Sequence, residues 1–191
     1  MFEAQVLIAR QARVGHITIN RPQVLNAINL SMCMSIKAAM DEWRDDPSIE
    51  LVIIDATGEK AFSVGGDIND IYQAGILGDY QYSQHLWQRE YPFIASIGDY
   101  PKPYIAFMDG YVMGLGAGLA MHASHRIVTE RTRFAMPECA IGHIPDVGSS
   151  AIFAAAPGAS GLYLGLTGTR INAADCIYTG FADFYIPSRQ V

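Results

Sequence analysis

Cysteine is scarce in this sequence. The 191 residues include three cysteines, Cys33, Cys139 and Cys176, and no two of them form a CxxC pair. An odd number without such pairs argues against a secreted scaffold built on disulfides and favours a reducing compartment. We therefore expect a cytoplasmic protein, or a mitochondrial matrix protein if the source is eukaryotic and a presequence has been removed.

Positive charge and long apolar runs are scarce as well. The 13 lysines and arginines are outnumbered by 19 acidic residues, which gives a formal net charge of −6. Broad nucleic-acid binding requires a basic surface, so nucleic acid is not an expected partner. No apolar run of the sequence approaches the length of a bilayer span, so a membrane is not an expected partner either.

The composition is typical of a well-buried globular protein. Half of the residues are hydrophobic and only 17% are charged. No linker, charge block or low-complexity tract divides the chain. We therefore predict a single domain that covers residues 1–191.

Apolar patterns predict an alternation of strands and helices, which indicates an α/β fold with crossover units. Residues 2–20 alternate as two strands joined by a hairpin. A helix follows, with Asn29 or Ser31 as its N-cap and Pro47 at its end. Further strands are predicted at 50–58, 101–113 and 126–138. Further helices are predicted over most of 71–100, at 153–166 with an interruption at Pro157 and Gly158, and in 171–187 before a last strand.

Two glycine-rich turns each follow a predicted strand and precede a predicted helix, around Gly65–Gly66 and around Gly114–Gly118. Glycine lets a backbone approach a ligand closely, and the helix behind the turn offers unpaired N–H groups. Two such turns that meet in space would supply the two donors of an oxyanion hole, although each alone is better explained as a plain turn. The second turn lacks the small residue that a dinucleotide fingerprint requires, so no nicotinamide cofactor is expected.

Two carboxylates stand in the otherwise apolar stretch FAMPECAIGHIPDVGSS. Glu138 follows a proline, and Asp146 lies eight residues later. A buried carboxylate with a raised pKa can act as general base or nucleophile, and two in different environments can divide the acid and base roles. By spacing alone, a turn-capping aspartate and an ion-paired glutamate remain the simpler interpretation.

Other polar residues carry weaker signals. Glu90, in QREYP, fits a solvated helix face. His122 and His125 lack companion ligands, so no metal is expected. His143 follows Cys139 by four residues, which allows a thiol–imidazole pair, although a simple loop histidine is the better interpretation. No G-x-S-x-G elbow occurs, which argues against a common serine hydrolase.

Three segments, AFSVGGDI, PKPYIAFMDGYVMGLGAGL and FAMPECAIGHIPDVG, together closely resemble the crotonase (enoyl-CoA hydratase/isomerase) superfamily, and most of all its 3-hydroxyisobutyryl-CoA hydrolase branch. The resemblance covers nearly the whole chain. It implies a crotonase-like spiral of repeated ββα units and hydrolysis of a short, branched β-hydroxyacyl-CoA thioester, as in valine degradation. Coenzyme A is then part of the substrate, and no separate cofactor is implied.

The resemblance also implies how the substrate is held. The thioester oxygen would lie between the backbone N–H groups of Gly66 and Leu115. The family usually has glycine at the second of these positions, and a leucine there keeps the donor but adds a side chain near the acyl pocket. Val64, where the branch tends to have a small residue, and Leu25 complete the predicted substrate-binding positions.

The carboxylates acquire roles in the same way. Glu138 matches the catalytic glutamate that hydratases and hydrolases share, and Asp146 matches the aspartate of the hydrolase branch. Glu90 matches a substrate-contacting glutamate, which outweighs its interpretation as a solvated residue. Gly118 stands where hydratases carry their other glutamate, and a glycine cannot activate water.

Two alternatives remain open at this point. One is an enoyl-CoA hydratase or isomerase with Glu138 as the single acid–base, and the other is a non-catalytic acyl-CoA-binding subunit. Family members continue into a helical C-terminal region that helps close the acyl pocket and often builds the oligomer. We expect that region to be absent or truncated here, and the resemblance leaves room for a homo-oligomer.

Overall fold

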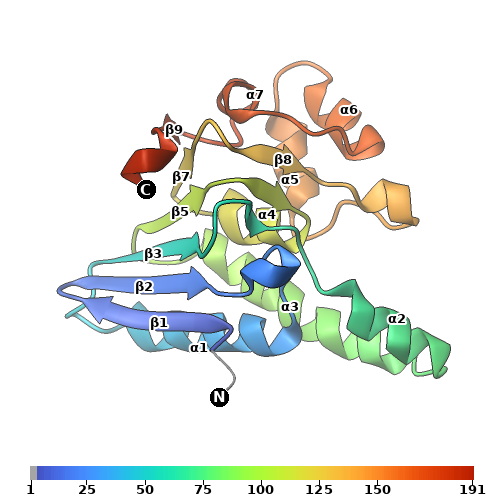
Figure 1. The fold of residues 1–191 in the computed structure, drawn as a ribbon, viewed down its shortest axis with the longest axis horizontal. Helices are drawn as coiled ribbons and strands as arrows, with labels where there is room; N and C mark the ends of the chain where they lie inside the picture. Colours follow the sequence, from blue (N-terminus) through green and yellow to red (C-terminus); the bar gives the residue numbers. More distant parts are fainter. Residues whose placement is uncertain (1–3) are drawn as a thin grey trace.

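The computed structural model describes residues 4–191 and shows two sheets with helices packed around them (Figure 1). In this part of the chain the larger sheet has six strands in the order β1-β2-β3-β5-β7-β9, and the smaller has three in the order β4-β6-β8. β1 (Val6–Gln11) and β2 (Val14–Ile19) form the predicted antiparallel hairpin, and the other pairings are parallel. The predicted α/β class is confirmed.

The remaining elements follow in order along the chain. The strands are β3 (Leu51–Ala56), β4 (Ala61–Ser63), β5 (Tyr104–Met108), β6 (Tyr111–Met113), β7 (His125–Val128), β8 (Arg133–Ala135) and β9 (Phe184–Tyr185). The α-helices are α1 (Leu30–Arg44), α2 (Ile68–Ile76), α3 (Gln81–Gly98), α4 (Leu115–Met121), α5 (Ser149–Ala155), α6 (Ser160–Thr167) and α7 (Ala173–Thr179). Three short 3-10 helices are η1 (Pro22–Val24), η2 (Glu138–Ile141) and η3 (Ser188–Gln190).

Helix boundaries follow the local signals. The Asn29 side chain caps α1 by accepting the N–H of Met32 at 3.0 Å, as predicted. The interruption at Pro157 and Gly158 falls between α5 and α6, which confirms that break. The predicted helical stretch from residue 71 contains two helices, α2 and α3, because the chain turns at Gly78, which has a φ of +76°.

Two strand predictions are wrong in the same way. The sequence predicts one strand in each of the stretches 101–113 and 126–138, but each forms two strands that belong to different sheets. β5 gives way to β6 at Gly110, which has a φ of +75°, and β7 gives way to β8 across Thr129–Thr132. A short strand, β4, also follows β3 and was not predicted. The unit that repeats is therefore two strands at a corner, followed by a helix.

The corners of successive units stack on one another. The Tyr111 N–H donates to the carbonyl of Lys60 at 2.9 Å, and the Arg133 N–H donates to the carbonyl of Gly110 at 2.8 Å. A Cβ on Gly110 would collide with the Lys60 carbonyl oxygen. Glycine is required here because it combines a left-handed conformation with close backbone contact. The stacking makes the chain wind as a spiral from one unit to the next.

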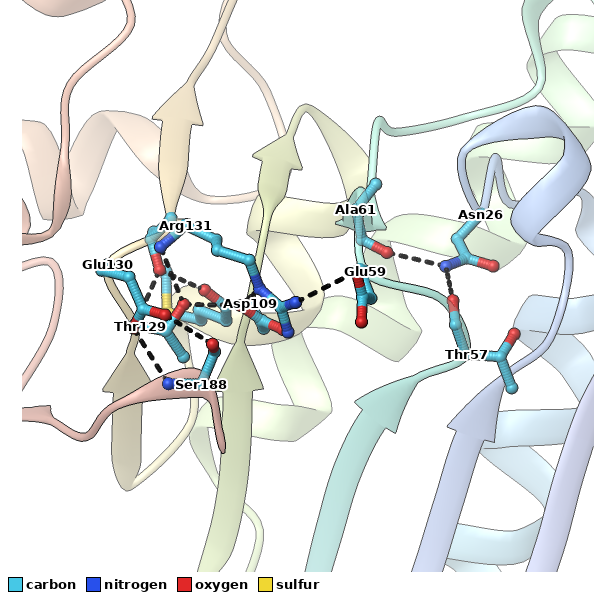
Figure 2. Close-up of polar contacts among 11 residues, drawn as sticks. Asn26, Thr57, Glu59, Ala61, Asp109, Thr129, Glu130, Arg131 and Ser188 are labelled. Atoms are coloured by element: carbon cyan, nitrogen blue, oxygen red, sulfur yellow. Dashed lines mark hydrogen bonds and ion pairs between the residues drawn. The ribbon is translucent and has the colours of Figure 1, made fainter. Parts of the chain in front are cut away.

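Polar side chains fasten this stack (Figure 2). The Asp109 carboxylate accepts hydrogen bonds from the Thr129 hydroxyl at 2.5 Å and from Arg131 Nε at 3.0 Å, which ties the second corner to the third. Glu130 accepts the N–H of Ser188 at 2.9 Å and thereby holds the C-terminal segment against the third corner. The arrangement satisfies backbone and side-chain groups that the turns would otherwise leave unpaired.

Asn26 fastens the first corner. Its side-chain amide donates to the carbonyls of Thr57 at 3.0 Å and Ala61 at 2.7 Å (Figure 2). Its Oδ1 accepts the N–H of Arg21 at 2.8 Å. The residue is only 1% exposed, and its φ is +57°. Asparagine tolerates the left-handed region better than most residues, so one residue supplies both the turn and the bonds that anchor it.

The hydrophobic core fills the space between the sheets and the helices. α1 contributes Met32, Ile36, Met40 and Trp43, which are at most 2% exposed. All seven residues of α4 are buried, so this helix lies inside the molecule rather than on a face of it. Burial of each large side chain stabilises the fold by roughly 1.5–3 kcal/mol. The core thereby fixes the loops at the ends of β4, β6 and β8.

Candidate active site

The two glycine turns meet. β4 and β6 are parallel neighbours, so the turns that follow them both lie at the carboxyl ends of the strands, on the same side of the sheet. A Cβ on Gly65 would lie 3.4 Å from the amide nitrogen of Leu115, and a Cβ on Gly114 would lie 3.6 Å from Cα of Gly65. Both glycines have positive φ angles, +109° and +49°. The structure thus brings together the two turns that the sequence singled out.

Both predicted amide donors are available for a ligand. Leu115 is the first residue of α4, where an N–H has no partner within the helix. Next to Gly66, Ile28 donates to the Gly65 carbonyl and accepts from the Asp67 N–H, each at 2.8 Å, which leaves the Gly66 N–H unused. Within residues 4–191 neither the Gly66 nor the Leu115 N–H has a hydrogen-bond acceptor. Their role as an oxyanion hole stays a prediction.

Leu115 is packed among buried residues. It is 5% exposed and belongs to the hydrophobic core. Gly116, next in α4, packs so closely that a Cβ would lie 2.6 Å from Cβ of Ser63. The leucine is therefore accommodated by burial in the core.

Glu138 lies directly beside the second glycine turn. β8 is the parallel neighbour of β6, and Glu138 opens η2 just after β8 ends. Its Oε1 is 2.9 Å from the position of a Cβ on Gly114. The residue is 8% exposed, and its Oε2 is buried without a hydrogen-bond partner among the described residues. Burial raises the pKa of Glu138 to about 7, a backbone hydrogen bond opposes this, and the charge of Asp146 adds to it.

Glu90 is buried as well, so its interpretation as a solvated helix residue is wrong. It lies on the buried face of α3 with Leu86, Phe93 and Ile94 and is 6% exposed. Burial raises the pKa of Glu90 to about 7, and the charge of Asp146 contributes in the same direction. Asp146 therefore interacts electrostatically with both glutamates, which places the three carboxyl groups in one region.

A hydrogen bond from α3 holds the side chain of Asp146 in place. Its Oδ2 accepts the hydroxyl of Tyr91 at 2.8 Å, which draws together the helix and the loop after η2. Nε2 of His143 lies 3.5 Å from the same oxygen, a contact without hydrogen-bond geometry. The ring of Trp87 stacks on those of Tyr91 and His143, with centroids 6.5 Å and 5.5 Å away.

The aromatic side chains were not singled out in the sequence, although a signal was present. Trp87 and Tyr91 are four residues apart and share one side of α3, and Glu90 lies between them. The suggested thiol–imidazole pair does not form, because the thiol of Cys139 donates to the Gly165 carbonyl at 3.2 Å. His143 stacks on Trp87 instead.

The turn that carries Asp146 has an unusual backbone. Val147 and Gly148 have φ angles of +47° and +77°, and the Ser149 N–H closes the turn on the Asp146 carbonyl at 2.8 Å. A left-handed conformation is costly for a β-branched residue such as valine. His122, at the end of α4, bonds through Nε2 to the Val147 carbonyl at 2.7 Å and helps to hold it.

Val147 also fills the space next to Gly118. A Cβ on Gly118 would lie 2.7 Å from Cβ of Val147, closer than such atoms approach in proteins. The position where hydratases would carry a second glutamate therefore has no room for a side chain in this arrangement. The glycine is required by packing.

Leu25 and Val64 lie side by side next to the first glycine turn. The Val64 N–H donates to the Leu25 carbonyl at 3.2 Å, and both residues are partly buried. Leu25 has a φ of +53° and precedes Asn26, so the hydrogen bonds of Asn26 fix its position as well. Their contact with substrate stays a prediction.

Repeated ββα units, with one glycine turn after β4 and another after β6, define the class of protein as a crotonase-type α/β fold. The chain belongs to the enoyl-CoA hydratase/isomerase family, whose model matches residues 14–191. Both the predicted spiral and the predicted family are thereby confirmed. In residues 4–191 every helix is too short or too polar to cross a bilayer.

Individual relatives refine the comparison. The chain is 42% identical to a mitochondrial 3-hydroxyisobutyryl-CoA hydrolase of Xenopus tropicalis, over 99% of this chain and 49% of that protein. It is 36% identical to a probable 3-hydroxyisobutyryl-CoA hydrolase of Arabidopsis thaliana, over 99% and 50%. An enoyl-CoA hydratase structure from Rhodobacter sphaeroides superimposes with a TM-score of 0.96 at 46% identity, over 98% of this chain and 56% of that one. The chain spans about half the length of the curated relatives it matches.

Proposed function

We propose that this chain carries the catalytic site of a thioesterase that hydrolyses a short, branched β-hydroxyacyl-CoA such as 3-hydroxyisobutyryl-CoA. The observation that carries the proposal is the position of Glu138. This buried carboxylate has one oxygen without a partner among the described residues, and it stands beside the second of two adjoining glycine turns, each of which has one unused amide donor. The names of the curated relatives support the substrate class.

The amides of Gly66 and Leu115 would bind the thioester oxygen and stabilise the negative charge that develops on it. Each donor of such a pair typically contributes about 3 kcal/mol to the stability of the transition state. Each turn is held by a parallel strand on one side and by core packing on the other. The donors therefore need no rearrangement when the charge appears.

Glu138 would supply or activate the nucleophile that bonds to the carbonyl carbon. As a carboxylate it either attacks the carbon itself or removes a proton from the water that attacks. The carbon–sulfur bond then breaks, and the CoA thiolate leaves with the electron pair. In the first route one water molecule then hydrolyses the acyl-glutamyl anhydride, which releases the acid and restores the free carboxylate. A pKa of about 7 leaves a substantial fraction of Glu138 ionised at neutral pH.

The other carboxyl groups would assist from the same region. Asp146, oriented by the Tyr91 hydroxyl, would bind the substrate hydroxyl or deliver a proton to the leaving sulfur. Glu90 would hold the polar end of the acyl group from α3. Leu25 and Val64 would contact the substrate at the first glycine turn. The cytoplasmic or mitochondrial location and the homo-oligomer stay predictions.

The decisive test is thiol release from 3-hydroxyisobutyryl-CoA by the full-length protein and its Glu138→Gln variant. We expect the variant to lose at least about 100-fold in kcat, because the amide cannot act as nucleophile or base. Glu50→Gln is the matched control, since Glu50 is exposed and forms only a surface ion pair with Arg13. A Glu138→Gln enzyme with the wild-type rate would refute the role of Glu138.

A second candidate is an enoyl-CoA hydratase or isomerase that uses Glu138 as its single acid–base. The Rhodobacter sphaeroides structure, at 46% identity, favours it. The packing of Gly118 against Val147 argues against it, because hydration then lacks the other glutamate. Loss of enone absorbance from crotonyl-CoA would support this candidate. Binding of CoA esters without any turnover would support a non-catalytic subunit.

A further inference from the structure

We propose that His143 is a specificity-determining residue, which recognises a hydroxyl group on the acyl chain together with Asp146. The inference rests on the proposed function, since it names a feature of the substrate of that same site. It starts from buried polar atoms without partners. Among residues 4–191 there are six such side-chain atoms, and three of them, on Glu138, His143 and Ser149, lie in the segment that carries the candidate acid and base.

His143 is fixed from two sides. Its backbone N–H donates to the Glu138 carbonyl at 3.1 Å, so the two residues keep a constant separation along η2. Its ring stacks on Trp87 of α3, with an angle of 13° between the ring planes. These contacts leave few rotamers open to the imidazole. A side chain that is held in place can discriminate between ligands that differ in one polar group.

The imidazole nitrogen that lies nearest to Asp146 lacks a partner within residues 4–191. Nε2 of His143 is buried, and Oδ2 of Asp146, at 3.5 Å, is too poorly aligned to accept a hydrogen bond from it. That oxygen already accepts the Tyr91 hydroxyl at 2.8 Å. Leaving a buried polar atom unpaired destabilises the protein, so a ligand group that pairs with Nε2 would gain binding free energy from it.

A hydroxyl is the group that fits this arrangement. It accepts one hydrogen bond and donates another, so it can accept from the Nε2–H of His143 and donate to a carboxylate oxygen of Asp146. A methyl group would leave Nε2 unpaired and offer Asp146 no donor, and a carbonyl would satisfy only the imidazole. The titratable groups that interact with Asp146 include Glu138 on η2, and Glu90 and Tyr91 on α3. The surroundings therefore favour a neutral donor–acceptor over an anion.

The test compares two substrates that differ only in the hydroxyl, 3-hydroxyisobutyryl-CoA and isobutyryl-CoA, in the full-length protein. His143→Phe keeps a ring against Trp87 but removes the donor. We expect the ratio of kcat/KM for the hydroxylated over the plain substrate to fall about tenfold, mainly through KM. His143→Gln, which restores an N–H donor, should recover part of the ratio. His85→Phe, at an exposed position of α3, is the matched control and should leave the ratio unchanged.

Binding measurements separate this inference from the proposed function. The dissociation constants of both CoA esters are measured in Glu138→Gln, with and without His143→Phe, or His143→Leu if the phenylalanine does not fold. A fall in the preference for the hydroxylated ester supports the role of His143 even if no thioester is hydrolysed. An unchanged ratio, or an equal loss for both esters, overturns it even if hydrolysis is confirmed. Failure of both esters to bind overturns both proposals.

Discussion

The carboxylate of Glu138 occupies space that opens only because residue 114 is glycine. Oε1 lies 2.9 Å from where a Cβ on Gly114 would stand, so even a methyl group would collide with it. The backbone of Gly114 also has φ +49° and ψ −125°, a region that side chains other than glycine rarely allow. One glycine thus sets both the path of the turn and the place of the candidate base.

Gly114→Ala is therefore expected to damage stability and activity together. The strained backbone should cost about 1–3 kcal/mol of unfolding free energy, measured in urea. Displacement of Glu138 should lower kcat by at least about tenfold in the thioesterase assay. Gly75→Ala in α2 is the control, because no atom lies within 4 Å of the added Cβ, and it should be neutral or slightly stabilising. A Gly114→Ala enzyme with wild-type stability and rate would contradict the geometry.

Gly118→Ala should destabilise the fold by overpacking. Its Cβ would lie 2.7 Å from Cβ of Val147, whose own backbone is already left-handed. We expect a loss of about 1–3 kcal/mol in urea unfolding, while Gly98→Ala, at an open position at the end of α3, loses at most a few tenths. For the same reason, Gly118→Glu should not produce a crotonyl-CoA hydratase. Appearance of hydratase activity in that variant would show that Val147 can move to make room for the glutamate side chain.

The buried glutamates make stability depend on pH. The pKa values of Glu138 and Glu90 are raised from 4.5 to about 7, so between these pH values the folded state keeps protons that the unfolded chain has released. Stability must therefore fall as pH rises through this window. Glu138→Gln removes the loss of stability that comes from ionising Glu138 in the folded state. It should unfold like the wild type at pH 4 but be more stable by about 1–2 kcal/mol at pH 8.

The control for this pH effect is Glu50→Gln, which should follow the wild type at every pH because the residue is exposed. Activity should change in the opposite direction. Glu138 reacts as a carboxylate, so kcat/KM should rise as pH increases through about 7. A stability difference between Glu138→Gln and wild type that is the same at pH 4 and pH 8 would show that Glu138 is not titrating in the folded protein.

Local signals in the sequence were enough for much of the fold. The cap at Asn29, the hairpin before it and the break at Pro157 depend on neighbouring residues, so they could be predicted and were confirmed. The corners at Gly110 and after Val128 were not placed, although Asp109–Gly110 and the polar run of residues 129–133 interrupt the apolar pattern there. Their direction is set by contact with an earlier turn of the spiral, such as that of Tyr111 with Lys60.

The candidate site was predicted in part for the same reason. The glycine turns and Glu138 stand out by residue type, and parallel pairing of β4, β6 and β8 brings them together. Tyr91 and Trp87 were missed because an aromatic pair on a helix usually belongs to the core. The left-handed backbone of Val147 contradicts local preference and is visible only where His122 and Gly118 enclose it.

The wholly buried α4 has a consequence for how the protein matures. Seven residues of glycine, alanine, leucine and methionine are far too few to form a stable helix alone in water, so α4 arises only once both sheets enclose it. We therefore expect the N–H of Leu115 to become oriented only after the two sheets have formed around α4. Recovery of ligand binding after denaturation would report completion of the entire spiral, a stricter criterion than the return of helical circular dichroism.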